Sequence, residues 1–219
     1  MDVLAGLNQA QREAVQCVHG PLLIVAGPGS GKTRVIAHRI AYLVHELGVP
    51  PRHILAVTFT NKAAREMRDR VAALLGDDAA RSMALGTFHA RCAHMLRTDG
   101  AAVGVDPHFT IYDADDQVAL VKRAMADVGV DSRSYTPRAV LGAISRAKNE
   151  MRTPAEYARA AADYYQEVVA RVWARYQELL GEARALDFDD LLLRAVSLLE
   201  RVEGVRHAYQ ARYRYVLID

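Results

Sequence analysis

The segment from residue 26 to residue 33 reads Ala-Gly-Pro-Gly-Ser-Gly-Lys-Thr, and it constrains the fold more than any other. It matches the pattern G-x-x-x-x-G-K-[ST], except that alanine stands at the first glycine position. Its three glycines allow the backbone to approach phosphate oxygens closely and to adopt positive φ. The amide groups of such a loop, with the N-terminus of the next helix, form a cradle for anions. An apolar run, Leu22–Ala26, precedes the loop and a helical pattern begins near Lys32, so we expect strand, loop and helix in that order.

Two side chains of this loop have defined roles in phosphate chemistry. Lys32 would reach the β- and γ-phosphates, and the hydroxyl of Thr33 would ligate Mg²⁺. The matching carboxylate is expected at the end of a neighbouring strand, and Asp219 follows the apolar run of residues 215–218. We predict a nucleotide site with Lys32 and Asp219 as catalytic residues and with Thr33 and Asp219 as metal ligands. The alternatives are a glycine-rich turn without a ligand and a strand that merely meets a turn.

Apolar runs alternate with helical patterns in the first 90 residues. Further runs occupy Ile54–Thr60 and Met83–Phe88, and this alternation is typical of a parallel sheet covered on both faces. From residue 91 the pattern is helical, and only residues 215–219 return to strand character. The sequence therefore predicts an α/β domain, residues 1–90 and 209–219, interrupted by an inserted all-helical subdomain, residues 91–208. Within the insertion we expect helix caps at four residues: Asp113, Thr136, Thr153 and Asp187.

Composition excludes several classes of protein. No stretch approaches the roughly 20 apolar residues of a membrane span, and the N-terminus does not resemble a secretory signal, so we expect a cytoplasmic protein without a membrane partner. The two cysteines, Cys17 and Cys92, lie far apart and indicate neither a metal site nor a disulfide framework. The net charge is only +2, so any nucleic-acid surface must be a local groove.

Several segments, taken together, resemble superfamily-one DNA helicases of the UvrD/PcrA/Rep group. They occur in the family's order: LNQAQREAV (7–15), AGPGSGKTRVIAHRI (26–40), ILAVTFTNKAAREM (54–67), GTFHA (86–90), FTIYDADDQ (109–117), DFDDLLLRA (187–195) and YVLID (215–219). The resemblance implies a RecA-like ATP-binding domain with the helical insertion described above. It also implies ATP and Mg²⁺ as cofactors.

The resemblance assigns further residues to the nucleotide. Gln11 would hydrogen-bond the adenine edge, although Asn8 and Gln11 also form a capping-box pattern, and both roles are compatible. Arg34 would pack on the adenine; an exposed helical arginine is the alternative. The implied nucleotide-binding set is Gln11, Ala26, Gly27, Pro28, Gly29, Ser30, Gly31, Lys32, Thr33 and Arg34.

Two strand ends are assigned to single-stranded DNA by the same resemblance. Phe59 would stack on bases, with Thr60 and Asn61 contacting the strand, and stacking of this kind tolerates any base sequence. Thr87, Phe88 and His89 lie at the end of a second strand, where open sheets bind ligands, and Thr87 and His89 would add contacts to the DNA there. The alternatives are that Phe59 lies in the sheet core and that Thr60 or Asn61 caps the next helix.

Polar residues in the inserted region have less specific interpretations. Lys148 and Asn149 lie in a basic segment that could contact duplex DNA, but a solvated helix face is the simpler interpretation. Asp189 and Asp190, near the start of a predicted helix, are assigned to capping and the helix dipole, without a catalytic role. Trp173 lies in an apolar helical stripe and is expected in the core.

The resemblance implies 3′-to-5′ translocation on single-stranded DNA and at junctions with duplex. In that family a glutamate follows the strand aspartate, and a second, C-terminal motor domain completes the ATP cleft. Neither occurs within residues 1–219, so we expect this segment alone to hydrolyse ATP poorly and to unwind no DNA. A non-enzymatic nucleotide- or DNA-binding module is the alternative function. Another phosphate-loop enzyme, such as a kinase, would leave TFTNKAA and GTFH unexplained. The sequence leaves open repair, replication restart and recombination.

Overall fold

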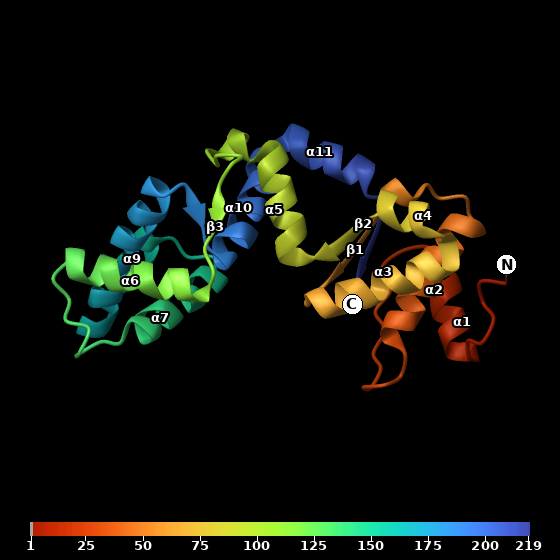
Figure 1. The fold of residues 1–219 in the computed structure, drawn as a ribbon, viewed down its shortest axis with the longest axis horizontal. Coiled ribbons are helices and arrows are strands. Elements are labelled where there is room, and N and C mark those ends of the chain that lie inside the picture. Colours follow the sequence, from red (N-terminus) through yellow and green to blue (C-terminus); the bar gives the residue numbers. More distant parts are fainter. Residues whose placement is uncertain (1) are drawn as a thin grey trace. The chain divides into compact units, whose positions relative to one another are not determined.

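The computed structural model describes residues 2–219, which form two compact units (Figure 1). Unit 1 contains the chain up to Arg91 together with Gly204–Asp219, and unit 2 is Cys92–Glu203. The unit boundaries lie at 91/92 and 203/204, one residue and five residues from the predicted ones.

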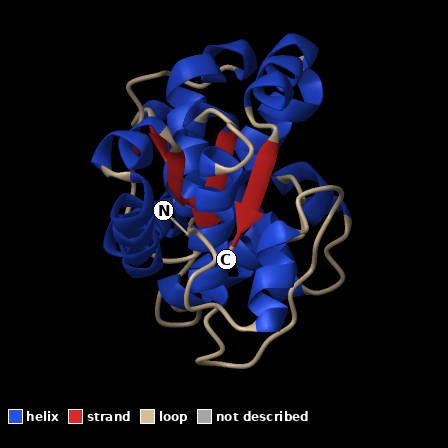
Figure 2. Ribbon diagram, turned by 90° about the vertical axis from the view of Figure 1, so that its right-hand side faces the viewer, coloured by secondary structure: helices blue, strands red, loops and turns tan. Residues whose placement is uncertain are grey.

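Unit 1 is built on a three-stranded parallel sheet, whose strands are red in Figure 2. The strand order is β2 (Ala84–Thr87), β1 (Ile54–Thr58) and β5 (Tyr215–Ile218). β1 pairs in parallel with both neighbours, with Thr58 beside Thr87 and Val57 beside Ile218. The carboxyl ends of all three strands therefore meet at one edge of the sheet. This sheet and the many helices confirm the predicted α/β class.

Helices of unit 1 supply the rest of its core. They are α1 (Gln9–Gln16), α2 (Lys32–His45), α3 (Asn61–Leu75), α4 (Asp77–Ser82) and α11 (Glu203–Arg212), with a short 3₁₀ turn at Pro51–His53; α5 (Phe88–Asp99) begins here and ends in unit 2. Ile40 and Leu43 of α2, Met67 and Val71 of α3, and Ile54 of β1 are fully buried in one cluster. The apolar faces of α2 and α3 thus pack together over the sheet.

The predicted strand at Leu22–Ala26 is wrong in this structure. The segment has no strand assignment, and no backbone hydrogen bond joins it to any other described residue. Leu23 and Val25 are 86% and 89% exposed. The physical reason is the extent of the sheet: within residues 2–219 it ends at β5, whose outer edge pairs with no strand. The run does not pair with that edge, so its amide and carbonyl groups are left without strand partners.

Unit 2 is mainly helical. Its elements are a 3₁₀ turn (Gly100–Val103), β3 (Thr110–Ile111), α6 (Ala114–Asp127), α7 (Pro137–Asn149), α8 (Pro154–Arg159), α9 (Tyr164–Glu182), β4 (Ala185–Leu186) and α10 (Phe188–Arg201). The predicted caps Asp113, Thr136, Thr153 and Asp187 all accept backbone hydrogen bonds at helix starts and are confirmed. Trp173 is 1% exposed within the unit's core cluster, as predicted.

Two details of unit 2 differ from the sequence interpretation. The helix begun at Thr153 ends at Arg159, and α9 starts separately after its own cap, Asp163. β3 and β4 form a short parallel pair that the helical pattern concealed. Among the helices that the structure describes, none has the length and apolar character that crossing a membrane requires.

Candidate functional site

The glycine-rich loop adopts a backbone that glycine alone accommodates readily. Gly29 and Gly31 have φ values of 76° and 88°, in the left-handed region. Gly31 is also the residue before α2, so the loop leads directly into the N-terminus of that helix. A Cβ atom at Gly31 would lie 3.2 Å from Nε2 of Gln11, so a side chain here would crowd the contact beneath the loop.

Lys32 projects back over its own loop. Its Nζ donates hydrogen bonds to the carbonyl oxygens of Ala26 and Gly27, both at 2.9 Å. The hydroxyl of Ser30 donates to the same Gly27 oxygen at 2.7 Å. Lys32 is exposed, and its carbonyl partners are neutral, so phosphate oxygens can replace them with a gain in charge attraction.

Thr33 and Asp219 meet although 186 positions separate them in sequence. The Thr33 hydroxyl donates to a carboxylate oxygen of Asp219 at 2.8 Å. The amide of Asp219 donates to the carbonyl of Val57 at 3.0 Å, which fixes Asp219 just beyond the carboxyl end of β5. A hydroxyl and a carboxylate are the oxygen ligands that Mg²⁺ prefers, and Mg²⁺ usually completes its shell with water and phosphate. The residues present therefore fit this metal.

Gln11 joins the loop to α1. Its side chain and that of Asn8 form a reciprocal capping box at the start of the helix, which confirms the structural interpretation. The Nε2 of Gln11 also donates to the Ser30 carbonyl at 3.1 Å. One amide side chain thus serves both the cap and the loop.

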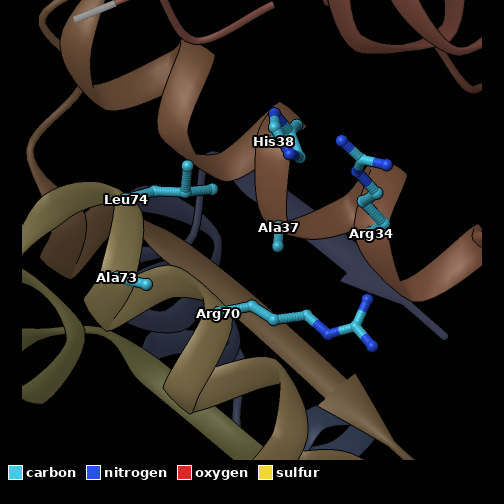
Figure 3. Close-up of a pocket in the computed structure, with 6 residues that line it drawn as sticks. All are labelled: Arg34, Ala37, His38, Arg70, Ala73 and Leu74. Atoms are coloured by element: carbon cyan, nitrogen blue, oxygen red, sulfur yellow. The ribbon is translucent and has the colours of Figure 1, made fainter. Parts of the chain in front are cut away.

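Arg34 lines a cavity of about 250 Å³ between α2 and α3 (Figure 3). The other lining residues are Ala37 and His38 of α2 and Arg70, Ala73 and Leu74 of α3. The guanidinium of Arg34 forms no hydrogen bond or ion pair with any residue that the structure describes. It is therefore available to a ligand near the start of α2.

An aromatic pair lies at the carboxyl ends of β1 and β2. Phe59 is 74% exposed, and its ring centroid lies 5.2 Å from that of Phe88 at an interplanar angle of 49°. The pairing of Thr58 with Thr87 places these two rings side by side, one residue beyond each strand. The alternative that Phe59 lies in the sheet core is wrong. The sequence interpretation placed Phe88 at this strand end with Thr87 and His89 but gave it no stacking role, although it ends an apolar run much as Phe59 does.

The polar residues assigned to DNA are held less freely. The Thr60 hydroxyl accepts from the Ala63 amide and caps α3, and the Thr87 hydroxyl accepts from the Ala90 amide. Asn61 is the exposed first residue of α3, whereas His89 is half-buried in the first turn of α5. The capping alternative for Thr60 is confirmed, and Phe59 is the open ring of the aromatic pair, since Phe88 is half-buried.

Lys148 is a buried residue, which contradicts both its assignment to a solvated helix face and a contact with duplex DNA. It is 1% exposed, and its Nζ lies 2.7 Å from Asp187 and 2.8 Å from Asp190. The hydroxyl of Tyr176 donates to Asp187 at 2.9 Å. Burial raises the pKa of Asp190, and the charge of Lys148 opposes that shift. Asn149 is exposed and bonds to the Ser145 carbonyl of its own helix.

Comparison with known proteins identifies relatives over almost the whole chain. The family model described as UvrD/REP helicase N-terminal domain matches residues 7–219. The chain is 50% identical over 214 residues to the ATP-dependent DNA helicase PcrA of Leuconostoc citreum, which covers 98% of this chain and 29% of that protein. It is 46% identical over 217 residues to the protein of the same name from Staphylococcus aureus, covering 99% and 30%. The Bacillus subtilis protein of that name is also 46% identical, with 99% and 29% covered. This chain thus spans less than a third of the length of these relatives.

Proposed function

Because the chain belongs to the UvrD/REP helicase N-terminal domain family, we propose that it forms the ATP- and DNA-binding part of an ATP-dependent DNA helicase that moves 3′ to 5′. In this proposal residues 1–90 and 209–219 are the motor domain, residues 91–208 are the inserted subdomain, and a further motor domain completes the enzyme. The DNA partner is a single strand, including the single strand at a junction with duplex. The curated relatives are named ATP-dependent DNA helicases, and the chain spans 29–30% of their length.

The observation that carries the proposal is the contact between Thr33 and Asp219. Two residues 186 positions apart meet at 2.8 Å beside a glycine-rich loop and at the start of a helix. A helix start attracts anions, and a hydroxyl–carboxylate pair attracts Mg²⁺. A turn that only joined two elements would need neither the carboxylate nor the exposed lysine.

Residues of the loop and beside it have distinct roles in binding ATP. Lys32 exchanges the Ala26 and Gly27 carbonyls for phosphate oxygens and holds the triphosphate in place. Mg²⁺, when bound, neutralises phosphate charge that develops during transfer. Gln11 stands next to Ser30 with one amide contact to the loop, and Arg34 offers an unpaired guanidinium to the adenine face.

The DNA-binding surface is formed by Phe59 and Phe88 at the sheet edge that also carries Asp219. Stacking of bases on an exposed aromatic ring is worth roughly 1–3 kcal/mol per base and does not depend on base identity. A motor that moves along any sequence needs this kind of contact. Asn61 is the exposed polar neighbour, Thr60 and Thr87 accept amides of the backbone that presents the rings, and His89 lies in the first turn of α5.

For residues 1–219 alone we propose binding of ATP with little turnover. Among the described residues, Asp219 is the sole carboxylate that bonds to a side chain of the loop, and it faces Thr33 as a metal ligand. A carboxylate that holds the metal would not also orient an attacking water. This observation favours the second candidate function for the isolated segment, a nucleotide- and DNA-binding module without catalysis.

Titration with a fluorescent ATP analogue tests the nucleotide site. Lys32→Ala is expected to abolish detectable binding, and Asp219→Asn to remove most of the dependence on Mg²⁺. Lys122→Ala, an exposed lysine of α6 in unit 2, is the matched control and should bind as the parent does. Equal affinities for the parent and Lys32→Ala would refute the site. Fast ATP hydrolysis by residues 1–219, stimulated by single-stranded DNA, would refute the module without catalysis.

A further inference from the structure

Unit 2 contains a cavity that the proposed function does not use. Its volume is about 320 Å³, at the lower end of the range for small-molecule sites. It lies among the end of α7, the start of α8, and α9 and α10. The lining residues are Lys148, Met151, Arg152, Thr153, Pro154, Trp173, Gln177, Asp190, Leu193, Arg194, Ser197, Glu200 and Arg201.

Two arginines of α10 contribute charges to this cavity that the fold does not use. Arg194 and Arg201 are exposed and seven residues apart, which places them on the same face of the helix, two turns from each other. Neither guanidinium forms a hydrogen bond or an ion pair with a residue of the described chain. Arg152, from the end of α7, adds a third cation, paired only at the surface with Glu150 at 3.0 Å.

The floor of the cavity differs from its rim, because the cation of the floor is already paired. Lys148 is already paired with Asp187 and Asp190, and the amide of Gln177 lies 3.5 Å from Asp190. Trp173 is 1% exposed, and its Nε1 has no hydrogen-bond partner among the described residues. The charged residues of the lining are four cations (Lys148, Arg152, Arg194 and Arg201) and two carboxylates (Asp190 and Glu200), so an excess of positive charge is left for an anionic ligand.

Met151 has a conformation that folding does not favour. Its φ is 58°, in the left-handed region, and it follows the end of α7 where glycine is usual. The turn is held by bonds from Met151 to the Lys148 carbonyl and from Arg152 to the Ala147 carbonyl, at 2.8 and 3.1 Å. The Met151 side chain is nevertheless 55% exposed and lines the cavity. A residue that is strained here and contributes little to the core is a candidate for ligand contact.

We propose that this cavity binds a nucleotide, with its phosphate held by Arg194, Arg201 and Arg152. Arginine is the side chain best suited to phosphate, because its planar guanidinium donates two parallel hydrogen bonds. Met151 and Leu193 supply an apolar wall for the flat base, and Ser197 on α10 supplies a hydroxyl near the two arginines. The nucleotide is either free or part of a strand, since both present the same phosphate and base.

Trp173 is the only tryptophan of the sequence and lines this cavity, so its fluorescence reports on the site. The experiment titrates AMP and a short single-stranded oligonucleotide into the chain carrying Lys32→Ala, which disables the loop in unit 1. We expect a saturable change in Trp173 fluorescence with at least one of them. Arg194→Gln combined with Arg201→Gln should weaken it about tenfold or more, because each removes a charge-assisted bond. Arg138→Gln, an exposed arginine of α7 outside the cavity, should leave it unchanged.

The outcomes separate cleanly. Saturation by AMP alone supports a free nucleotide, and saturation by the oligonucleotide alone supports a strand. Equal affinities in the double arginine variant and in Arg138→Gln would overturn the proposal, and so would an equal response to adenosine, which lacks the phosphate.

Met151→Gly provides an independent measurement. It should raise the melting temperature by relieving the left-handed φ, yet weaken AMP binding; undiminished binding would remove the apolar wall from the proposal.

Discussion

Lys32 in unit 1 and Lys148 in unit 2 show how differently the two units use the same side chain. Lys32 is exposed and bonds to two neutral carbonyls of its own loop, partners that a ligand can replace. Lys148 is 1% exposed and is bonded to two carboxylates that have no other cation within hydrogen-bond distance among the described residues. An exposed lysine with neutral partners can bind a ligand, whereas a buried paired lysine contributes stability. The environment, more than the residue type, decides which.

The largest expected effect is on stability in unit 2. Lys148→Ala leaves two buried carboxylates without their cation, and breaking such a pair costs about 3–5 kcal/mol. Urea unfolding followed by Trp173 fluorescence measures this loss within the same unit. Lys32→Ala is the matched control and should change the unfolding free energy by less than about 0.5 kcal/mol. A similarly small change in unfolding free energy for both variants would refute the stabilising role of Lys148.

The stability loss of Lys148→Ala should depend on pH. Burial already raises the pKa of Asp190, and removing Lys148 takes away the attraction that opposes the shift. A carboxyl whose folded-state pKa exceeds its unfolded value favours folding at low pH, and this contribution is lost as the pH rises through the folded pKa. The deficit of Lys148→Ala should therefore shrink as the pH approaches the unfolded value for aspartate, near 3.9. A deficit independent of pH would argue against buried carboxylates as its cause.

The next effect is on binding in unit 1. Phe59→Ala should weaken single-strand binding by roughly 1–3 kcal/mol, because one stacking surface is lost. Fluorescence anisotropy with a labelled oligonucleotide, repeated at several salt concentrations, measures the change. The fold should be little affected, since the ring is 74% exposed. Phe109→Ala, a buried phenylalanine of unit 2, should show the opposite pattern of lost stability and retained affinity.

The smallest effect compares two helix caps. Thr60→Ala in unit 1 and Thr136→Ala in unit 2 each remove a hydroxyl that accepts an amide at a helix start, for about 1 kcal/mol of stability. Thr60 also borders the aromatic pair, so its loss alone should reduce single-strand affinity. Thermal unfolding measures the loss of each cap, and anisotropy on the same preparations measures single-strand affinity. Equal single-strand affinities of Thr60→Ala and Thr136→Ala would confine Thr60 to its capping role.

Local patterns predicted much of the fold because their causes are local. The caps at Asp113, Thr136 and Asp187 were recognised from side chains that compete for nearby amides, and α2 was recognised from its apolar spacing. β1, β2 and β5 were found from short apolar runs between helices. The separate cap at Asp163 was not predicted, because the apolar spacing of α9 begins soon after the capping box of α8.

Long-range contacts were harder to anticipate. Leu22–Ala26 has strand composition, but composition cannot supply the neighbouring strand that pairing requires. Lys148 has the sequence of a surface residue, and only the approach of Asp187 and Asp190 from 39 and 42 positions away makes its burial possible. In the candidate site, motif spacing indicated Lys32, Thr33 and Asp219; the structure joins Thr33 to Asp219, whereas Lys32 bonds to carbonyls of its own loop. The pairing of Phe59 with Phe88 depends on strand order, which the sequence did not state.

The open outer edge of β5 bears on how this chain behaves at high concentration. Val216 and Ile218 are each 57% exposed along that edge, and Leu23 and Val25 are exposed in the unpaired run before the loop. Unpaired edges and apolar β-prone runs recruit one another between molecules, which leads to aggregation. Isolated preparations should therefore become turbid as they are concentrated. A charged residue at Val216 or Leu23 would act as a gatekeeper and extend solubility without touching the phosphate loop.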